Sequence, residues 1–199
     1  MESRVKLAGH PLHQMLIVFP LGLLATAVVF DVIFLVTDNP SWTMAAFYMI
    51  GVGVLTGLAA AVPGAVDWLA IPRGTRAKRI GLVHGAGNVV VVALFAVSWY
   101  LRRDQPAAPP TGAVVAGLLG AGLSVVTGWL GGELVGRLGV GVDDGAHLDA
   151  PSSLTARPAA AATGAEFRAG MSHGYSGAER RRFPQPAYAG IDRRGRSSA

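Results

Sequence analysis

One side chain that can bind a metal or move a proton lies at or next to one end of each of four apolar segments. His13 precedes the first segment, Asp67 ends the second, His84 begins the third and Glu133 ends the fourth. Ionisable residues inside a membrane span cost about 2.5–3.5 kcal/mol on insertion scales and often serve function. If the segments are antiparallel helices, these four side chains gather at one end of a bundle. Asn88 lies one helical turn after His84 and adds an amide to the same end.

Three interpretations of this group remain open from the residues alone. His13 and His84 could be the axial ligands of a b-type haem, or they could bind a divalent metal ion together with Asp67 and Glu133. Chains of His, Asp and Glu can also form a proton-linked relay or transport element. In the third interpretation the groups are structural and hydrogen-bond one another and the helix ends, with Glu133 paired to Arg137 one turn away.

The segments that position these side chains are predicted to be transmembrane helices. Hydrophobic residues make up 51% of the 199 residues and charged residues only 15%, which is unusual for a soluble domain. About 20 apolar residues in a helix cross a hydrocarbon core of about 30 Å. Lipid also requires the backbone to satisfy its own hydrogen bonds, which favours helices. The predicted spans are residues 15–36, 44–69, 80–101 and 113–132.

The fold class expected is therefore an all-α membrane protein. We predict an antiparallel four-helix transmembrane bundle in residues 1–142, followed by a disordered tail in residues 143–199. The tail is rich in Ala, Pro, Ser, Gly and Arg, and it has too few large apolar residues to offset the entropy of ordering.

Lys and Arg near the span ends predict the orientation. On one side of the predicted bundle lie Arg4, Lys6, Arg73, Arg76, Lys78, Arg79 and Arg137. On the other side lie only Arg102 and Arg103. The positive-inside rule then places both termini in the cytoplasm.

Two more polar residues lie near or within the first span but outside the inner group. Asp31 follows His13 by about 27 Å along a helix, so it belongs to the outer half of the membrane. We expect it to pair with one of three side chains: Ser98, Tyr48 or Arg102. His10 precedes a proline just before the span and is expected at the membrane interface.

Small residues at four-residue spacing predict close helix packing. The fourth span carries Ala116, Gly120, Ser124, Gly128, Gly132 and Gly136, and the second carries Gly53, Gly57, Ala61 and Ala65. Packing within the bundle is the simpler explanation, and a homodimer interface is the alternative.

The tail and the overall charge suggest lipid as a partner. Eight arginines follow Asp143, and the pattern Tyr-x-Gly-x-acid-Arg-Arg occurs twice, at Tyr175–Arg181 and Tyr188–Arg194. A basic tail of this kind is attracted to anionic inner-leaflet lipids, and the repeated pattern could also be a paired docking motif. No folded basic face interleaved with aromatic residues is visible, so we expect no nucleic-acid partner.

Four segments in order resemble a known family. They are "GHPLHQMLIVFPLGLLATAVVFD" (Gly9–Asp31), "GLAAAVPGAVDWL" (Gly57–Leu69), "HGAGN" (His84–Asn88) and "TGWLGGELVGRLGVGV" (Thr127–Val142). They are similar to the signature segments of the bacterial membrane-protein family catalogued as domain of unknown function 2231. The resemblance covers about residues 8–142 and implies a four-span domain of the bacterial inner membrane without an established activity.

The resemblance also bears on the candidate site. The motif positions are occupied by His10, His13, Asp31, Asp67, His84, Asn88 and Glu133. One departure is Gln14, where many members of the family have proline. Some relatives resemble modules attached to redox domains, which adds weight to a haem and to a redox partner. The first hypothesis nevertheless remains a structural or accessory membrane module without an assigned enzyme activity.

Overall fold

The computed structural model describes residues 1–160 except 149 and 156, in two compact units. Met1–Asp144 forms the first unit and contains all of the long helices. Gly145 begins the second unit, whose described residues form short turns such as the one closed by the Ala150 N–H on His147 O (3.1 Å). The two Tyr-x-Gly-x-acid-Arg-Arg segments of the predicted tail lie outside the described residues.

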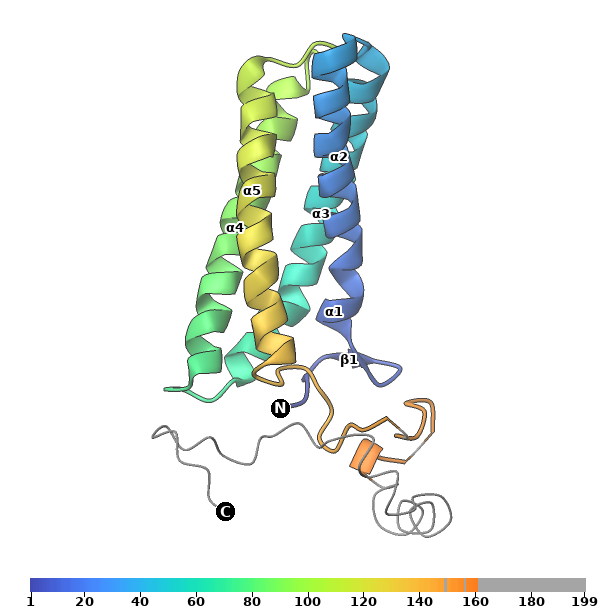
Figure 1. Ribbon diagram of the computed structural model, residues 1–199, viewed down its shortest axis with the longest axis vertical. Helices are drawn as coiled ribbons and strands as arrows, with labels where there is room; N and C mark the ends of the chain where they lie inside the picture. Colours follow the sequence, from blue (N-terminus) through green and yellow to red (C-terminus); the bar gives the residue numbers. More distant parts are fainter. Residues whose placement is uncertain (149, 156, 161–199) are drawn as a thin grey trace, which may run out of the picture. The chain divides into compact units, whose positions relative to one another are not determined.

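Four long helical segments run side by side through the first unit (Figure 1). In chain order the elements are β1 (Lys6–Leu7), β2 (His10–Pro11), α1 (Leu12–Leu16), α2 (Val18–Thr37), α3 (Pro40–Ala70), α4 (Arg76–Arg102) and α5 (Thr111–Gly136). The helical stretches Leu12–Thr37, α3, α4 and α5 are all long and apolar enough to cross a membrane. The predicted fold class is confirmed, because each predicted span lies within one of these stretches.

The first span is interrupted once, at Ile17 between α1 and α2. Pro20 lies three residues later and has no N–H to donate to the carbonyl of Leu16, so the first turns of the span lose one helical hydrogen bond. The helix continues nevertheless, because the Leu21 N–H donates to Ile17 O at 3.1 Å.

A short hairpin before the first span was not predicted. β1 and β2 are antiparallel, and Leu7 pairs with His10. The two residues between the strands, Ala8 and Gly9, have φ values of 50° and 82°, the left-handed conformation that a tight two-residue hairpin turn requires. His10 therefore lies in a strand that precedes the span.

Turn residues begin and end the spans. Asp38 ends α2 in the left-handed conformation (φ 55°), and its N–H donates to Phe34 O at 2.8 Å. Asn39 then caps α3, its side chain accepting the Ser41 N–H at 3.0 Å. Thr75 caps α4 by accepting the Lys78 N–H at 3.1 Å. Such caps satisfy N–H groups that the first helical turn leaves free.

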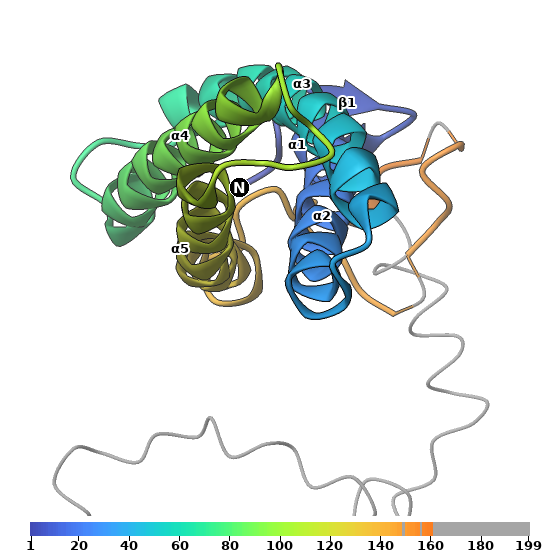
Figure 2. The same ribbon diagram turned by 90° about the horizontal axis from the view of Figure 1, so that it is seen from above.

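Two helical pairs make up the bundle. α2 packs on α3 and α4 on α5, and α3 and α4 join the pairs, whereas α2 and α5 have little contact with each other (Figure 2). The buried core is formed by α2, α3 and α4 and consists of Leu24, Ala27, Ala46, Ile50, Val91 and Phe95.

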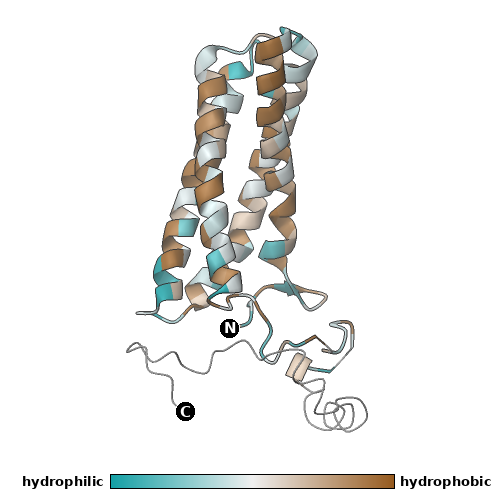
Figure 3. Ribbon diagram, in the orientation of Figure 1, coloured by the Kyte–Doolittle hydropathy of each residue, from teal (hydrophilic) through white to brown (hydrophobic). Residues whose placement is uncertain are grey.

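Hydrophobic residues occur along all of the long helices (Figure 3), and many of them are exposed. Large hydrophobic side chains on all four spans are exposed, among them Val36, Leu55, Val89 and Val125. Lipid tails are as apolar as these side chains, so a surface of this kind suits a helix bundle in a bilayer.

Only part of the small-residue series along the fourth span packs closely against another helix. A methyl group on Gly120 would lie 2.9 Å from Phe95 Cε2, so α4 and α5 approach closely there. Near the other end, Gly128, Gly132 and Gly136 would meet nothing within 4 Å among the described residues. The predicted intramolecular packing therefore applies to the first half of this series and not to the second.

Replacing Gly120 by alanine is expected to destabilise the bundle by about 1–3 kcal/mol, because Phe95 must shift to admit the methyl group. Gly122→Ala is the matched control on the same helix, since its methyl group would meet nothing within 4 Å. Reversible unfolding in mixed micelles measures both free energies. Equal stability of the two variants would contradict the close approach.

Candidate functional site

A buried ion pair joins α2 to α4 in the half of the bundle away from the N-terminus. Arg102 Nη1 donates to Asp31 Oδ1 at 2.8 Å, and Nη2 donates to Oδ2 at 3.0 Å. The side chain of Arg102 is 0% exposed and that of Asp31 2%. Two parallel charge-assisted bonds make this the strong, planar form of the interaction. Arg102 is one of the three partners predicted for Asp31.

Ser98 extends this pair to a third helix. Its hydroxyl accepts a bond from Arg102 Nη2 at 2.9 Å and donates to Ala113 O of α5 at 2.6 Å. Arg102 Nε also donates to Ser98 O, at 3.3 Å. Tyr48, another predicted partner of Asp31, is instead largely exposed. Each oxygen of Asp31 thus accepts one bond from Arg102, and Arg102 donates further bonds to Ser98, which compensates for the burial of both charges.

His13 and His84 meet in the other half of the bundle. Their ring centroids are 6.4 Å apart and the ring planes are perpendicular, at 89°. His13 Nδ1 lies 2.8 Å from Ala60 O of α3, and His84 Nδ1 lies 2.8 Å from Thr127 O of α5. Because a carbonyl can only accept, Nδ1 carries the proton in each ring. In the neutral form of each ring, Nε2 then carries the lone pair.

Two glycines allow the rings to lie against the facing helices. A methyl group on Gly64 would lie 2.8 Å from His13 Nδ1, and one on Gly131 would lie 3.1 Å from His84 Cε1. Both glycines stand in the apolar segments that resemble the family, but their contact with the histidines was not predicted. Gly64 lies one helical turn after Ala60, and Gly131 lies one turn after Thr127. This spacing is the sequence pattern that could have indicated the contacts.

Asn88 belongs to the surroundings of His84. Its Nδ2 donates to His84 O at 2.8 Å, and its Oδ1 accepts a bond from Thr127 Oγ1 at 3.2 Å. The same Nδ2 lies 3.4 Å from His84 Nδ1 and 3.3 Å from Nε2. The contact with Nε2 is within hydrogen-bond range, so the Asn88 amide can donate to the Nε2 lone pair of His84 in addition to its shorter bond to His84 O.

The two carboxylates of the predicted group are bound elsewhere. Asp67 accepts bonds from Ser3 Oγ at 2.7 Å and from the Arg4 N–H at 2.6 Å. Glu133 accepts a bond from Arg76 Nη2 at 2.6 Å. The predicted pairing of Glu133 with Arg137 is wrong, because α4 presents Arg76 to the carboxylate and Arg137 follows the end of α5.

The predicted metal ligands consequently do not form one set. Among the described residues no three or more His, Cys, Asp or Glu side chains are grouped so that they could hold a metal ion. His13 and His84 come together, whereas Asp67 faces the N-terminal segment and Glu133 faces Arg76. What is left is a pair of imidazoles without a carboxylate.

A b-type haem fits this pair only in part. The Nδ1–H bonds to backbone carbonyls suit axial histidines. A macrocycle also needs a slot between the rings, and two cavities at the ends of the bundle are lined by other residues. A single metal ion bound to both rings needs no such slot.

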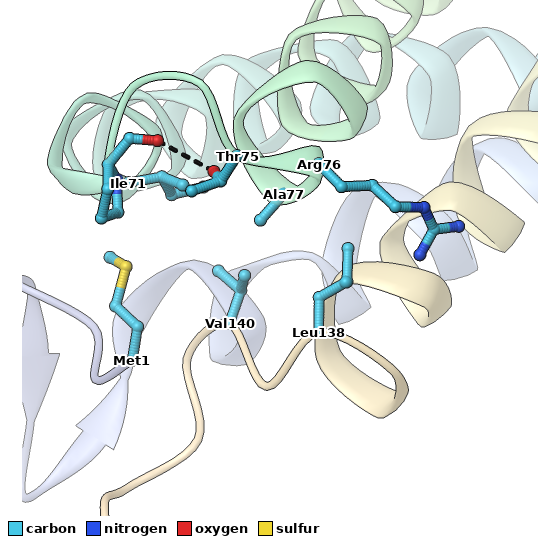
Figure 4. A pocket seen from close by; sticks show the side chains of 8 residues that line it. Met1, Ile71, Thr75, Arg76, Ala77, Leu138 and Val140 are labelled. Carbon is cyan, nitrogen blue, oxygen red and sulfur yellow. Dashed lines mark hydrogen bonds between the residues drawn. The ribbon is translucent and has the colours of Figure 1, made fainter.

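The cavity at the end near the N-terminus has a volume of about 290 Å³ and an apolar lining (Figure 4). Figure 4 shows Arg76 extending away from it, consistent with its bond to Glu133. The second cavity, of about 320 Å³, is lined by Leu101, Asp104, Gln105, Ala108 and Pro110 of the α4–α5 connection. Neither cavity brings several polar groups toward a common point.

The N-terminal segment closes the end of the bundle near the histidines. The terminal ammonium of Met1 donates to Gly139 O at 3.1 Å, and the Gly141 N–H donates to Met1 O at 2.9 Å. Lys6 forms ion pairs with Asp143 and Glu2. Its hydrogen bonds to these carboxylates raise the pKa of Lys6, and the bond from Lys6 lowers the pKa of Glu2. These contacts were not predicted, since Arg4 and Lys6 were considered only as topology signals.

Apolar residues separate the two polar groups. Leu24 lies between His13 and Asp31 along the first span, and Val91 and Phe95 lie between His84 and Arg102 along α4. The described residues therefore offer no continuous hydrogen-bonded chain from one group to the other, which a relay would use.

Comparison with known proteins gives a family but no activity. No curated protein and no solved structure is similar enough to the chain to count as a match. The family described as "Predicted membrane protein (DUF2231)" matches residues 9–144, which include all four spans and both polar groups. The chain therefore belongs to this family of predicted membrane proteins.

Proposed function

We propose that the domain is a structural or accessory membrane module whose polar side chains fasten its helices to one another. The observation that carries the proposal is the Asp31–Arg102 pair. Both side chains are buried and satisfy each other in two bonds, so neither is free for chemistry.

The inner group supports the same role. Its histidines and Thr127 bond to a neighbouring helix: His13 to α3, and both His84 and Thr127 to their partners across the α4–α5 contact. Asp67 bonds instead to the N-terminal segment through Ser3 and Arg4. Interhelical hydrogen bonds of this kind stabilise membrane bundles by about 0.6 kcal/mol on average. Glu133 adds an ion pair between α4 and α5 through Arg76.

We place the domain in a bacterial inner membrane with both termini in the cytoplasm. Strand β1, which contains Lys6, and the basic connection between α3 and α4 lie at the same end of the bundle (Figure 1), and the Arg4 N–H bonds to Asp67 near the end of α3. At the opposite end Arg102 is bound to Asp31, which leaves Arg103 as the only exposed Lys or Arg of the α4–α5 connection. The count of seven Lys and Arg at one end against two at the other supports this orientation by the positive-inside rule.

A redox partner, a homodimer and anionic lipids at the arginine-rich tail stay predictions. Residues 161–199 of that tail lie outside the described part of the chain. A relay is not favoured by any contact among the described residues, because the apolar core separates the polar groups.

Asp31→Asn is expected to lower the free energy of unfolding by about 3–5 kcal/mol, because it leaves the Arg102 charge buried without its counter-ion. Asp104→Asn is the control, since this carboxylate is 84% exposed and its replacement should change stability by less than about 0.5 kcal/mol. Unfolding in mixed micelles measures both. Similar small effects in the two variants would refute a fastening role for the pair.

Single cysteines test the orientation, since the natural chain has none. Gln105→Cys, in the α4–α5 connection, should react with a membrane-impermeant maleimide added outside spheroplasts. Arg73→Cys, in the exposed α3–α4 connection, should react only after permeabilisation. The reverse labelling pattern would place the termini outside.

A further inference from the structure

Residues that meet across the bundle occupy equivalent positions in two halves of the domain. His13 and His84 are 71 positions apart (84 − 13), and so are Asp31 and Arg102 (102 − 31). His13 faces His84, and Asp31 faces Arg102. In both pairs, the residue found 71 positions later is also the residue in contact. This indicates that an approximate two-fold rotation relates the first span to α4.

The second helix of each half follows the same relation with a shift of 67 positions. This shift takes Ala60 to Thr127, Gly53 to Gly120 (120 − 53) and Gly64 to Gly131 (131 − 64). Ala60 O binds His13 as Thr127 O binds His84.

The close contacts of the glycines repeat as well. Gly53 faces Leu24 as Gly120 faces Phe95, and Leu24 and Phe95 are themselves 71 positions apart. Gly64 faces His13 as Gly131 faces His84. Hydrogen bonds and close contacts of the first helical pair thus recur in the second.

These contacts define an axis that runs along the bundle between the first span and α4. Membrane proteins built from parallel repeats have such an axis along the membrane normal. Residues that meet their own equivalents lie at the axis, and among the described polar residues His13 with His84 and Asp31 with Arg102 do so. The two charges of the ion pair compensate each other, whereas the two imidazoles do not form a hydrogen bond with each other.

Both histidines are oriented by the same kind of hydrogen bond. Nδ1–H is held by a backbone carbonyl, the arrangement that fixes metal-binding histidines in the tautomer with Nε2 free. His13 Nε2 has no hydrogen-bond donor among the described residues, and the donor near His84 Nε2 is the Asn88 amide at 3.3 Å, which also donates to His84 O at 2.8 Å. The two Nε2 lone pairs thus share one long hydrogen bond, which a metal ion bound to both rings would replace.

We propose that His13 and His84 bind one transition-metal ion of the zinc or copper type at the two-fold axis through their Nε2 atoms. Metal–imidazole bonds of about 2.0–2.1 Å place two ring nitrogens about 4 Å apart when nitrogen, metal and nitrogen lie on a straight line. With the radius of a ring added at each end, this straight arrangement matches the observed centroid separation of 6.4 Å. Imidazole suits both zinc and copper. Copper(I) accepts two nitrogens in a straight line, whereas tetrahedral zinc requires the half-buried rings to move closer and water to complete its coordination.

Such an ion would connect the two halves of the domain. One ligand comes from each helical pair, so metal binding stabilises the folded state by joining them. This goes beyond the fastening role proposed above, which rests on bonds that need no metal. Failure of metal binding would leave that role intact, and the Asp31→Asn measurement tests it separately.

The test uses the full chain in detergent. After dialysis against Zn²⁺ or Cu²⁺ and removal of free metal, elemental analysis should find one ion per chain, and added metal should raise the thermal midpoint. His13→Gln and His84→Ala should weaken binding by more than about tenfold, the lower end of what loss of an outer-shell partner alone can cost. His10→Ala, which changes the histidine three residues before His13, should bind as the wild type does.

The His13→Gln variant separates loss of the metal ligand from loss of the fold. Its amide can still donate to Ala60 O, but it supplies no imidazole. Circular dichroism and gel filtration establish that each variant is folded. No metal on the folded wild type, or undiminished binding by folded His13→Gln, overturns the proposal. A Soret band that disappears in the same two variants would instead identify haem iron as the metal bound by both histidines.

Discussion

The Asp31–Arg102 ion pair is the constraint to which the rest of the bundle conforms. Hydrocarbon provides no water to solvate either charge, so the two side chains must meet, and α2 and α4 must lie where they can. The pair fixes the relative height of these helices. Ser98 then transmits the constraint to α5 through Ala113 O. Glycines such as Gly53 and Gly120 bring the partner helices close enough for the core to be filled.

The same geometry explains why the histidines meet. If Asp31 faces Arg102, then residues eighteen positions earlier in both helices lie at a common depth near the other membrane face, and these are His13 and His84. An approximate two-fold axis thus carries a pair of opposite charges at one end and a pair of identical side chains at the other. Opposite charges complete each other, whereas two neutral imidazoles with bound Nδ1 protons present two acceptors, for which a metal ion is a chemically suitable partner.

The sequence predicted the parts of this structure that depend on depth in the membrane. Hydropathy located the spans, and depth along the helix identified both the inner group and a short list of partners for Asp31 that included Arg102. Depth does not determine which way a side chain points around a helix, so Arg76, rather than Arg137, was missed as the partner of Glu133. The two-fold relation was hidden because its shift differs by about one helical turn between the two helices of a half. Its equivalent residues also differ in type, as Asp31 and Arg102 do.

The central claim is that Asp31 and Arg102 hold the domain together as a pair from equivalent places on either side of an axis. Exchanging the two charges, Asp31→Arg with Arg102→Asp, tests it most directly when the free energy of unfolding in mixed micelles is compared with that of each single replacement. The account predicts that the exchanged chain regains most of the stability that either replacement alone removes. An exchanged chain as unstable as the sum of the two single replacements would contradict it.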